Sequence, residues 1–154
     1  MGSWRRSEIV GTTENGNILM SDYGHHPNEI RPTLRAIREK YSDKKLFVVF
    51  QPHQYSRTRE LLQEFAISFL DVDTLIIPNI YFSRDKKEDV EWMTMDRLVG
   101  EIKKHQPNAI DGNGLENTVK LIQEYDRENP QSSIILLLGA GDIDGIRSEI
   151  KIQN

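Results

Sequence analysis

The chain has 154 residues and a formal charge of −4, and 37% of its residues are hydrophobic while 29% are charged. This length suits one globular domain, which buries roughly 68–70% of its unfolded surface. The absence of cysteine excludes a disulfide framework, a thiolate zinc site and a cysteine nucleophile. The negative charge argues against a nucleic-acid partner, and no apolar run approaches the roughly 20 residues that a membrane span needs. We therefore expect neither nucleic acid nor membrane as a partner.

Two short β-prone runs open the chain, at 8–11 and 17–22, and Asn15-Gly16 between them is typical of a hairpin turn. We therefore predict an N-terminal β-hairpin. Apolar residues then recur at helical spacing between residues 30 and 41. Because Pro32 lies inside this stretch, we expect either a helix that begins near Arg31 or a helix kinked at the proline.

Strands and amphipathic helices alternate in the rest of the chain. Continuously apolar runs predict buried strands at 46–50, 74–77 and 134–138, and 109–110 is a weaker strand. Helical spacing of apolar residues marks 61–69, 95–102 and 115–122, and a short terminal helix through residue 150 is expected. The alternation implies right-handed crossovers. The sequence thus predicts a three-layer, Rossmann-like α/β fold, a mainly parallel sheet of about six strands with helices on both faces, preceded by a β-hairpin.

Polar side chains cluster in two loops that follow predicted strands. The loop 22–27 contains a histidine pair, and the loop 51–60 contains His53, Tyr55 and Arg57. Ligands of open parallel sheets bind beyond the carboxyl ends of the strands. A guanidinium matches a carboxylate or phosphate through two parallel hydrogen bonds, so these loops favour an anionic small molecule. Turn formation and helix capping explain the same residues without a ligand, and both interpretations stay open.

Three other kinds of site are less favoured by the sequence. A zinc site on His25, His26 and His53 is disfavoured because adjacent histidines normally diverge and no carboxylate has ligand spacing, so we predict no metal. A serine hydrolase is disfavoured because no Gly-x-Ser-x-Gly elbow occurs. The glycine loop 139–145 suits an anion, but it departs from the dinucleotide fingerprint by one residue and no βαβ unit follows it.

Taken together, four segments in chain order resemble the C-terminal domain of the Mur ligase family. They are 22–30, 50–59, 80–84 and 138–143. Arg5-Arg6 with Glu8 and Gly11 resembles the segment that opens this domain, so the likeness runs as a single domain from residue 4 to residue 154. The string 51–58 favours the branch of the family that adds L-alanine over the branches that add D-glutamate, diaminopimelate or recycled tripeptide.

The resemblance implies an ATP-dependent amide ligase of peptidoglycan synthesis in the bacterial cytoplasm, with Mg²⁺ as its metal cofactor in the full-length enzyme. In that reaction the lactyl carboxylate of UDP-N-acetylmuramate becomes an acyl phosphate, and the amine of L-alanine attacks it. By resemblance, Arg57 holds the L-alanine carboxylate, and Tyr23, His25 and His53 line the same pocket. His25 or His53 is the catalytic group that takes the amine proton, and the sequence leaves this choice open.

The nucleotide side of the site rests on fewer residues. Asp22 matches the family position that meets the ribose, and an acceptor-only carboxylate suits two vicinal hydroxyls. Gln54 and Asp142 are additional candidates, although Gln54 stands where some family members carry arginine. Ser21 stands where a second acidic residue is common, and Pro32 is unexpected in the first helix.

No Gly-x-x-x-x-Gly-Lys-Ser/Thr phosphate loop occurs in the sequence. The family places that loop in a central domain and the UDP site in an N-terminal domain. We therefore expect one lobe of a three-domain enzyme, inactive by itself, which binds no cofactor tightly and meets ATP/ADP and UDP-N-acetylmuramate only with the other domains. No protein partner is predicted. The alternatives are a stand-alone, non-catalytic small-molecule-binding domain of the same fold and an unrelated nucleotide-binding α/β protein.

Overall fold

The computed structural model describes residues 6–153, so Trp4 and Arg5, at the start of the resemblance, lie outside the described residues. One sheet has the strand order β1-β2-β6-β3-β4-β5. The strands are β1 (Glu8–Thr12), β2 (Ile18–Asp22), β3 (Lys45–Phe50), β4 (Thr74–Ile77), β5 (Ala109–Asp111) and β6 (Ser133–Leu138). Only β1 runs antiparallel to its neighbour, and the other pairs are parallel. The predicted α/β fold with an N-terminal hairpin is confirmed.

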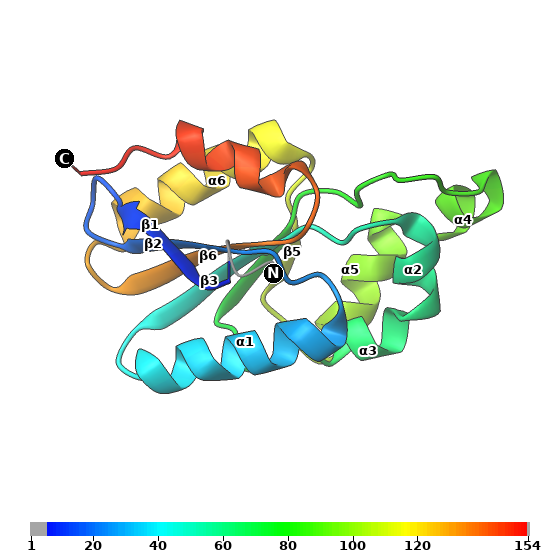
Figure 1. Cartoon of the computed structure of the whole chain (residues 1–154), viewed down its shortest axis with the longest axis horizontal. Helices are drawn as coiled ribbons and strands as arrows, with labels where there is room; N and C mark the ends of the chain where they lie inside the picture. Colours follow the sequence, from blue (N-terminus) through cyan, green and yellow to red (C-terminus); the bar gives the residue numbers. More distant parts are fainter. Residues whose placement is uncertain (1–5, 154) are drawn as a thin grey trace.

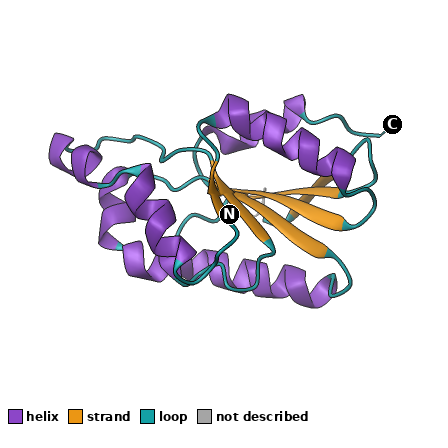
Figure 2. Cartoon of the chain, turned by 180° about the vertical axis from the view of Figure 1, so that it is seen from behind, coloured by secondary structure: helices purple, strands orange, loops and turns teal. Residues whose placement is uncertain are grey.

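Helices cover both faces of this sheet, which makes three layers (Figures 1 and 2). The helices are α1 (Pro27–Lys40), α2 (Tyr55–Glu60), α3 (Leu62–Ala66), α4 (Lys87–Trp92), α5 (Met95–Lys103) and α6 (Leu115–Glu128), with a 3₁₀ helix η1 (Asp142–Glu149). One face packs against α1, α3 and α5, and the other against α6 and η1. Figure 1 shows α4 next to α2, furthest from the strands.

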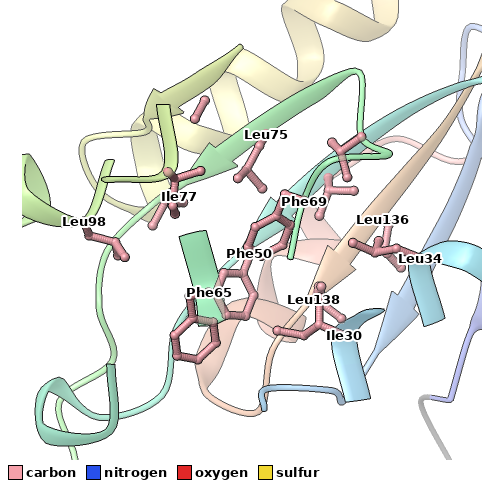
Figure 3. Packing of buried hydrophobic residues seen from close by; sticks show 14 of the residues in the cluster. Ile30, Leu34, Phe50, Phe65, Phe69, Leu75, Ile77, Leu98, Leu136 and Leu138 are labelled. Carbon is pink, nitrogen blue, oxygen red and sulfur yellow. The ribbon is translucent and has the colours of Figure 1, made fainter. Parts of the chain in front are cut away.

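The two apolar cores follow from the alternation of side chains along the strands. In β3, Val48 and Phe50 belong to the core beneath α1, whereas Phe47 and Val49 belong to the core beneath α6. The Phe50 ring packs on Phe65 and Phe69 at centroid distances of 5.5 and 5.1 Å (Figure 3). Because β3 and β6 are buried on both faces, their polar chemistry is confined to their ends.

Helix α1 begins at Pro27 and continues through Pro32. The expectation of a start near Arg31 is therefore wrong. A reciprocal cap holds the start of the helix: the Nδ1 atom of His26 accepts from a backbone amide, and Glu29 accepts from the backbone amide of His26. Pro27 occupies the first helical turn, where a missing N–H costs nothing. The cap and the apolar stripe buried beneath α1 outweigh the single hydrogen bond that Pro32 removes.

Three further details differ from the sequence-based expectation. The helix predicted over 61–69 is shorter in the structure, where α3 spans Leu62–Ala66, and the non-helical backbone at Leu61 separates it from α2, which the apolar spacing did not mark. The sequence did not predict helix α4, because none of its residues is buried and its apolar residues therefore do not recur at helical spacing. The terminal helix is a 3₁₀ helix.

A buried polar network closes the amino end of the sheet. The side chain of Asn17 donates to Asp126 Oδ1 (2.8 Å) and to the carbonyl of Asn129 (2.9 Å). Its oxygen accepts from the amides of Ser132 (3.0 Å) and Ser133 (2.9 Å). One side chain therefore joins the hairpin, the end of α6 and the start of β6.

We predict that Asn17→Ala lowers the free energy of unfolding by about 2–4 kcal/mol, because it leaves several buried groups without partners. Urea denaturation measures this loss. Asn15→Ala is the matched control, since Asn15 is less buried and donates once to Asp126, at 2.8 Å. Its expected loss is about 0.5–1.5 kcal/mol. Equal losses for the two variants would contradict the assignment of Asn17 as the centre of the network.

Candidate functional site

The loops predicted to carry chemistry lie on either side of β6. In the strand register, Asp22 at the end of β2 and Phe50 at the end of β3 both pair with Leu138, the last residue of β6. The loops 23–26 and 51–54 therefore leave the sheet at the same level. This edge is the carboxyl end of the parallel strands, where ligands of such sheets bind.

Four rings from three loops form a continuous row at this edge. Tyr23 meets His25 edge to face, with ring centroids 5.6 Å apart, and His25 meets His53 at 5.8 Å. His53 then stacks on Tyr81, at 5.3 Å and an interplanar angle of 20°. The sequence placed the first three residues in one pocket and missed Tyr81. Its signal was its position after β4, at the same edge of the sheet.

Glu29 fixes the backbone around His25. Its Oε1 atom accepts from the amides of His25 and His26, both at 3.1 Å, and lies 3.5 Å from Nδ1 of His25. Burial opposes ionisation, but these amides and the charges of His25 and Arg6 outweigh it and lower the pKa of Glu29. An ionised Glu29 is thus available to His25.

His26 takes a different direction from the other two histidines. Its Nδ1 atom accepts from the amide of Asn28 at 3.0 Å, so the side chain caps α1. Within the part of the chain that the structure describes, no group of three or more histidine or acidic side chains is placed to hold a metal ion. The capping interpretation therefore accounts for His26.

Arg57 lies on α2 and is exposed. In contrast to the side chain of Arg59, which pairs with Asp89 at 3.2 Å, the guanidinium of Arg57 forms no hydrogen bond or ion pair with any of residues 6–153. Its positive charge still acts electrostatically on the imidazole of His53. Burial, the neighbouring His25 and the Arg57 guanidinium lower the pKa of His53, against the opposing charge of Asp85. The edge thus combines an available cation with an imidazole that favours its neutral form.

The carboxylate of Asp22 is buried and holds the backbone of neighbouring segments. One oxygen accepts from the amide of Ser7 at 2.6 Å, and the other accepts from the amide of Gly24 at 2.7 Å. Only 1% of the residue is exposed. These contacts position the loop that carries Tyr23 and His25.

Gln51 links three strand ends and was not singled out from the sequence. Its buried Nε2 atom donates to Asp142 (2.7 Å) and to Asn79 (3.1 Å), and its Oε1 atom accepts from the amide of Ile143 (3.1 Å). The Asp142 carboxylate is thereby directed at Gln51. The available signal was a lone glutamine between a fully apolar strand and Pro52.

The glycine loop approaches this glutamine closely. A Cβ atom at Gly141 would lie 2.6 Å from Oε1 of Gln51, and one at Gly139 would lie 2.8 Å from the carbonyl oxygen of Gln51. Gly139 also has a φ of +148°, which disfavours other residues. Contact with the protein's own loop explains these glycines.

Gln54 contacts the loop after β4. Its side-chain amide donates to the carbonyl of Ser83 at 2.9 Å, and its backbone amide donates to the carbonyl of Tyr81 at 2.8 Å. These bonds, with the bridge between His53 and Tyr81, join the loops after β3 and β4. The structure thus brings Tyr23, His25, His53 and Arg57 to one edge, with Asp22, Gln54 and Asp142 bonded into the loops beside it.

None of the described helices has the length and apolar character of a membrane span.

Comparisons with known proteins agree with this picture. The family model described as "Mur ligase, glutamate ligase domain" matches residues 5–141. The UDP-N-acetylmuramate–L-alanine ligase of Geobacter sp. strain M21 is 37% identical over 142 residues, and that of Geobacter sulfurreducens is 39% identical over 147 residues. Each alignment covers 92% of this chain and 30% of the relative, so the chain spans less than a third of their length.

Solved structures show the same fold. UDP-N-acetylmuramate-alanine ligase from Thermotoga maritima superposes with a TM-score of 0.71 at 23% identity, over 94% of this chain and 28% of that one. A murein peptide ligase from Psychrobacter arcticus gives 0.72 at 16% identity, over 95% of this chain and 29% of that one. The match of the family model over most of the chain, together with the identity to curated relatives, shows that this chain belongs to the Mur ligase family, as a C-terminal domain of the L-alanine ligase type.

Proposed function

We propose that this chain is the amino-acid-binding domain of an ATP-dependent ligase that joins L-alanine to UDP-N-acetylmuramate. The proposal rests on the Arg57 guanidinium, which is available for a ligand and lies close enough to His53 to lower its pKa. His53 in turn contacts His25, and His25 contacts Tyr23, so the cation lies beside a row of rings. The two curated relatives supply the reaction class, since they are named as ligases of UDP-N-acetylmuramate and L-alanine.

In this proposal Arg57 binds the carboxylate of L-alanine through paired, charge-assisted hydrogen bonds. A carboxylate fixed in this way presents the α-amine in one direction. The row of rings borders the same space and limits where the amine and the small side chain lie. Such fixed presentation accelerates attack on an activated acyl group because the entropy of alignment is lost before the reaction.

His53 is the better candidate for the group that receives the amine proton. Its lowered pKa keeps the imidazole neutral at neutral pH, and a neutral imidazole has a nitrogen that accepts a proton. The Nδ1 atom of His25 lies 3.5 Å from Glu29, which also accepts from the backbone amide of His25. We therefore assign proton acceptance to His53 and a positioning role to His25.

ATP, with Mg²⁺, activates the carboxylate of the sugar substrate as an acyl phosphate. The described residues contain no cluster of metal ligands, and the chain spans less than a third of its curated relatives, so we propose that other parts of the full-length protein bind the phosphates, the metal ion and UDP-N-acetylmuramate. A direct contact of Asp22 with the ribose stays a prediction. Each carboxylate oxygen of Asp22 already accepts from a backbone amide, so the ribose would have to share these oxygens. We expect no turnover by the 154 residues alone.

The proposal is tested in a chimera in which this chain replaces the matching segment of the Geobacter sp. strain M21 ligase. We expect the chimera to release phosphate from ATP only when both UDP-N-acetylmuramate and L-alanine are present. Arg57→Gln should raise the KM for L-alanine by roughly 10- to 150-fold, because the charge-assisted bonds of one guanidinium are worth about 1.5–3 kcal/mol. The KM for ATP should stay within about twofold, since the substitution removes uniform binding of one substrate only.

Arg59→Gln is the matched control for this measurement. It makes the same chemical change on the same helix, but Arg59 is held by Asp89 at 3.2 Å and by the Trp92 ring at 4.5 Å. Equal effects of the two variants on the KM for L-alanine would refute the assignment of Arg57. An inactive chimera, together with L-alanine binding by the chain itself, would point to a stand-alone binding domain.

The charges around His53 give a second prediction, which needs no ligand. In the folded chain, NMR titration of the His53 imidazole should have its midpoint below the ordinary value of 6.5. Arg57→Gln should raise that midpoint, because it removes a neighbouring positive charge. Arg59→Gln should leave it unchanged.

The same shift has a consequence for stability. Because the unfolded chain binds a proton at His53 more readily than the folded chain, the contribution of His53 to the free energy of unfolding increases as the pH rises through the lowered midpoint toward 6.5. Replacing His53 with glutamine should flatten this part of the stability profile, as measured by urea denaturation at several pH values. A profile that keeps its full slope would contradict the lowered pKa.

A further inference from the structure

Helix α2, which carries Arg57, begins without a cap of its own. The residue that precedes it, Gln54, has a φ of 73° and makes no side-chain hydrogen bond to the first turn. Its side chain is used elsewhere, at the carbonyl of Ser83. The first amide groups of a helix have no partners within the helix and need acceptors from outside it.

Asp85, 30 residues further along the chain than Tyr55, supplies these acceptors. Its carboxylate accepts from the amide of Tyr55 at 3.0 Å and from the amide of Ser56 at 2.9 Å. It also accepts from the amide of Ser83 at 3.1 Å, which closes its own loop. Burial opposes ionisation of this carboxyl group, but the amides of Ser56, Tyr55 and Ser83 outweigh it and lower its pKa. The cap is therefore charged at neutral pH.

The position of Arg57 depends on this cap because α2 is short. The helix has only 6 residues, too few to be stable through its own hydrogen bonds. Arg57 is the third of these residues and follows directly after the two amides that Asp85 holds. Asp89, a carboxylate on the neighbouring helix α4, bonds to the side chain of Arg59 at 3.2 Å.

We propose that Asp85 is a positioning residue for L-alanine binding: by capping α2 from the loop after β4, its carboxylate holds the guanidinium of Arg57 beside His53. The identity of the ligand rests on the proposed function, whereas the positioning itself concerns residues of this chain alone. No described contact joins Asp85 to Arg57, so its effect passes through the backbone of α2.

The test is a double-mutant cycle read at His53 by NMR titration of the chain. The charged groups that influence His53 are His25 and Arg57, which lower its pKa, and Asp85, which raises it. Asp85→Asn removes one negative charge and should therefore lower the midpoint. If the substitution also releases Arg57 from His53, the lost influence of the guanidinium opposes part of this decrease.

We therefore expect Asp85→Asn to lower the midpoint less in the otherwise unaltered chain than in a chain that already carries Arg57→Gln. Equal decreases in both backgrounds would show that Asp85 acts on His53 through its charge alone and would overturn the proposal. Asp89→Asn is the matched control, because it removes the same charge near the same helix without removing the cap. It should show no coupling to Arg57.

The ligand is tested separately in the chimera with the Geobacter sp. strain M21 ligase. Asp85→Ala, which removes the acceptors of the cap, should raise the KM for L-alanine roughly five- to thirty-fold, the range that loss of a strong helix cap represents, with a smaller change in kcat. Asp85→Glu, which keeps the charge, should recover part of the loss. An unchanged KM would overturn the role in L-alanine binding. A chimera without L-alanine-dependent activity, combined with coupling at His53, would reject the proposed function and leave the positioning intact.

A second measurement decides the matter if Asp85→Asn does not fold. In the unaltered chain, the amide signals of Tyr55 and Ser56 should follow one titration with a midpoint below 3.8, the ordinary value for aspartate. The guanidinium signal of Arg57 should move with them. An Arg57 signal that ignores this titration would overturn the proposal as well.

Discussion

Burial of the central strands on both faces is the constraint on which the rest of this structure depends. All six residues of β6 are buried, as are five of the six residues of β3. A strand of this kind has no polar face, so its side chains offer nothing to a ligand until the strand ends. The carboxyl edge of the sheet is therefore where polar groups from β2, β3 and β4 meet.

Contacts at three depths build the candidate site at that edge. Gln51 is the innermost, since its buried amide bonds the ends of β3, β4 and β6 to one another. The loop backbones come next, held by carboxylates such as Asp22. The outermost layer is the row of rings and the Arg57 guanidinium. The groups of this outermost layer are the ones that we propose contact the ligand.

Several acidic residues beside the candidate site form hydrogen bonds with the backbone of its loops. Glu29, Asp22 and Asp85 each accept hydrogen bonds from two or more backbone donors. Charge-assisted bonds of this kind are stronger than neutral ones and fix the loops that present Tyr23, His25 and Arg57. Positioning of this kind fits the proposed L-alanine site, because the direction of the proposed carboxylate clamp depends on the helix that carries Arg57.

The fold class, the family and the edge of the sheet at which a ligand is predicted to bind could be read from the sequence, because apolar period and the loop motifs that carry the family resemblance are local properties. The β-hairpin, the strands β3, β4 and β6 and the residues Tyr23, His25, His53 and Arg57 were all found in this way. The tertiary structure decided which polar groups face one another. Tyr81, Gln51 and Asp85 were missed because they bond to partners 28 to 92 residues away in other loops, and no local pattern records such a distance. The path of α1 through Pro32 likewise depended on a cap and a buried face that only packing reveals.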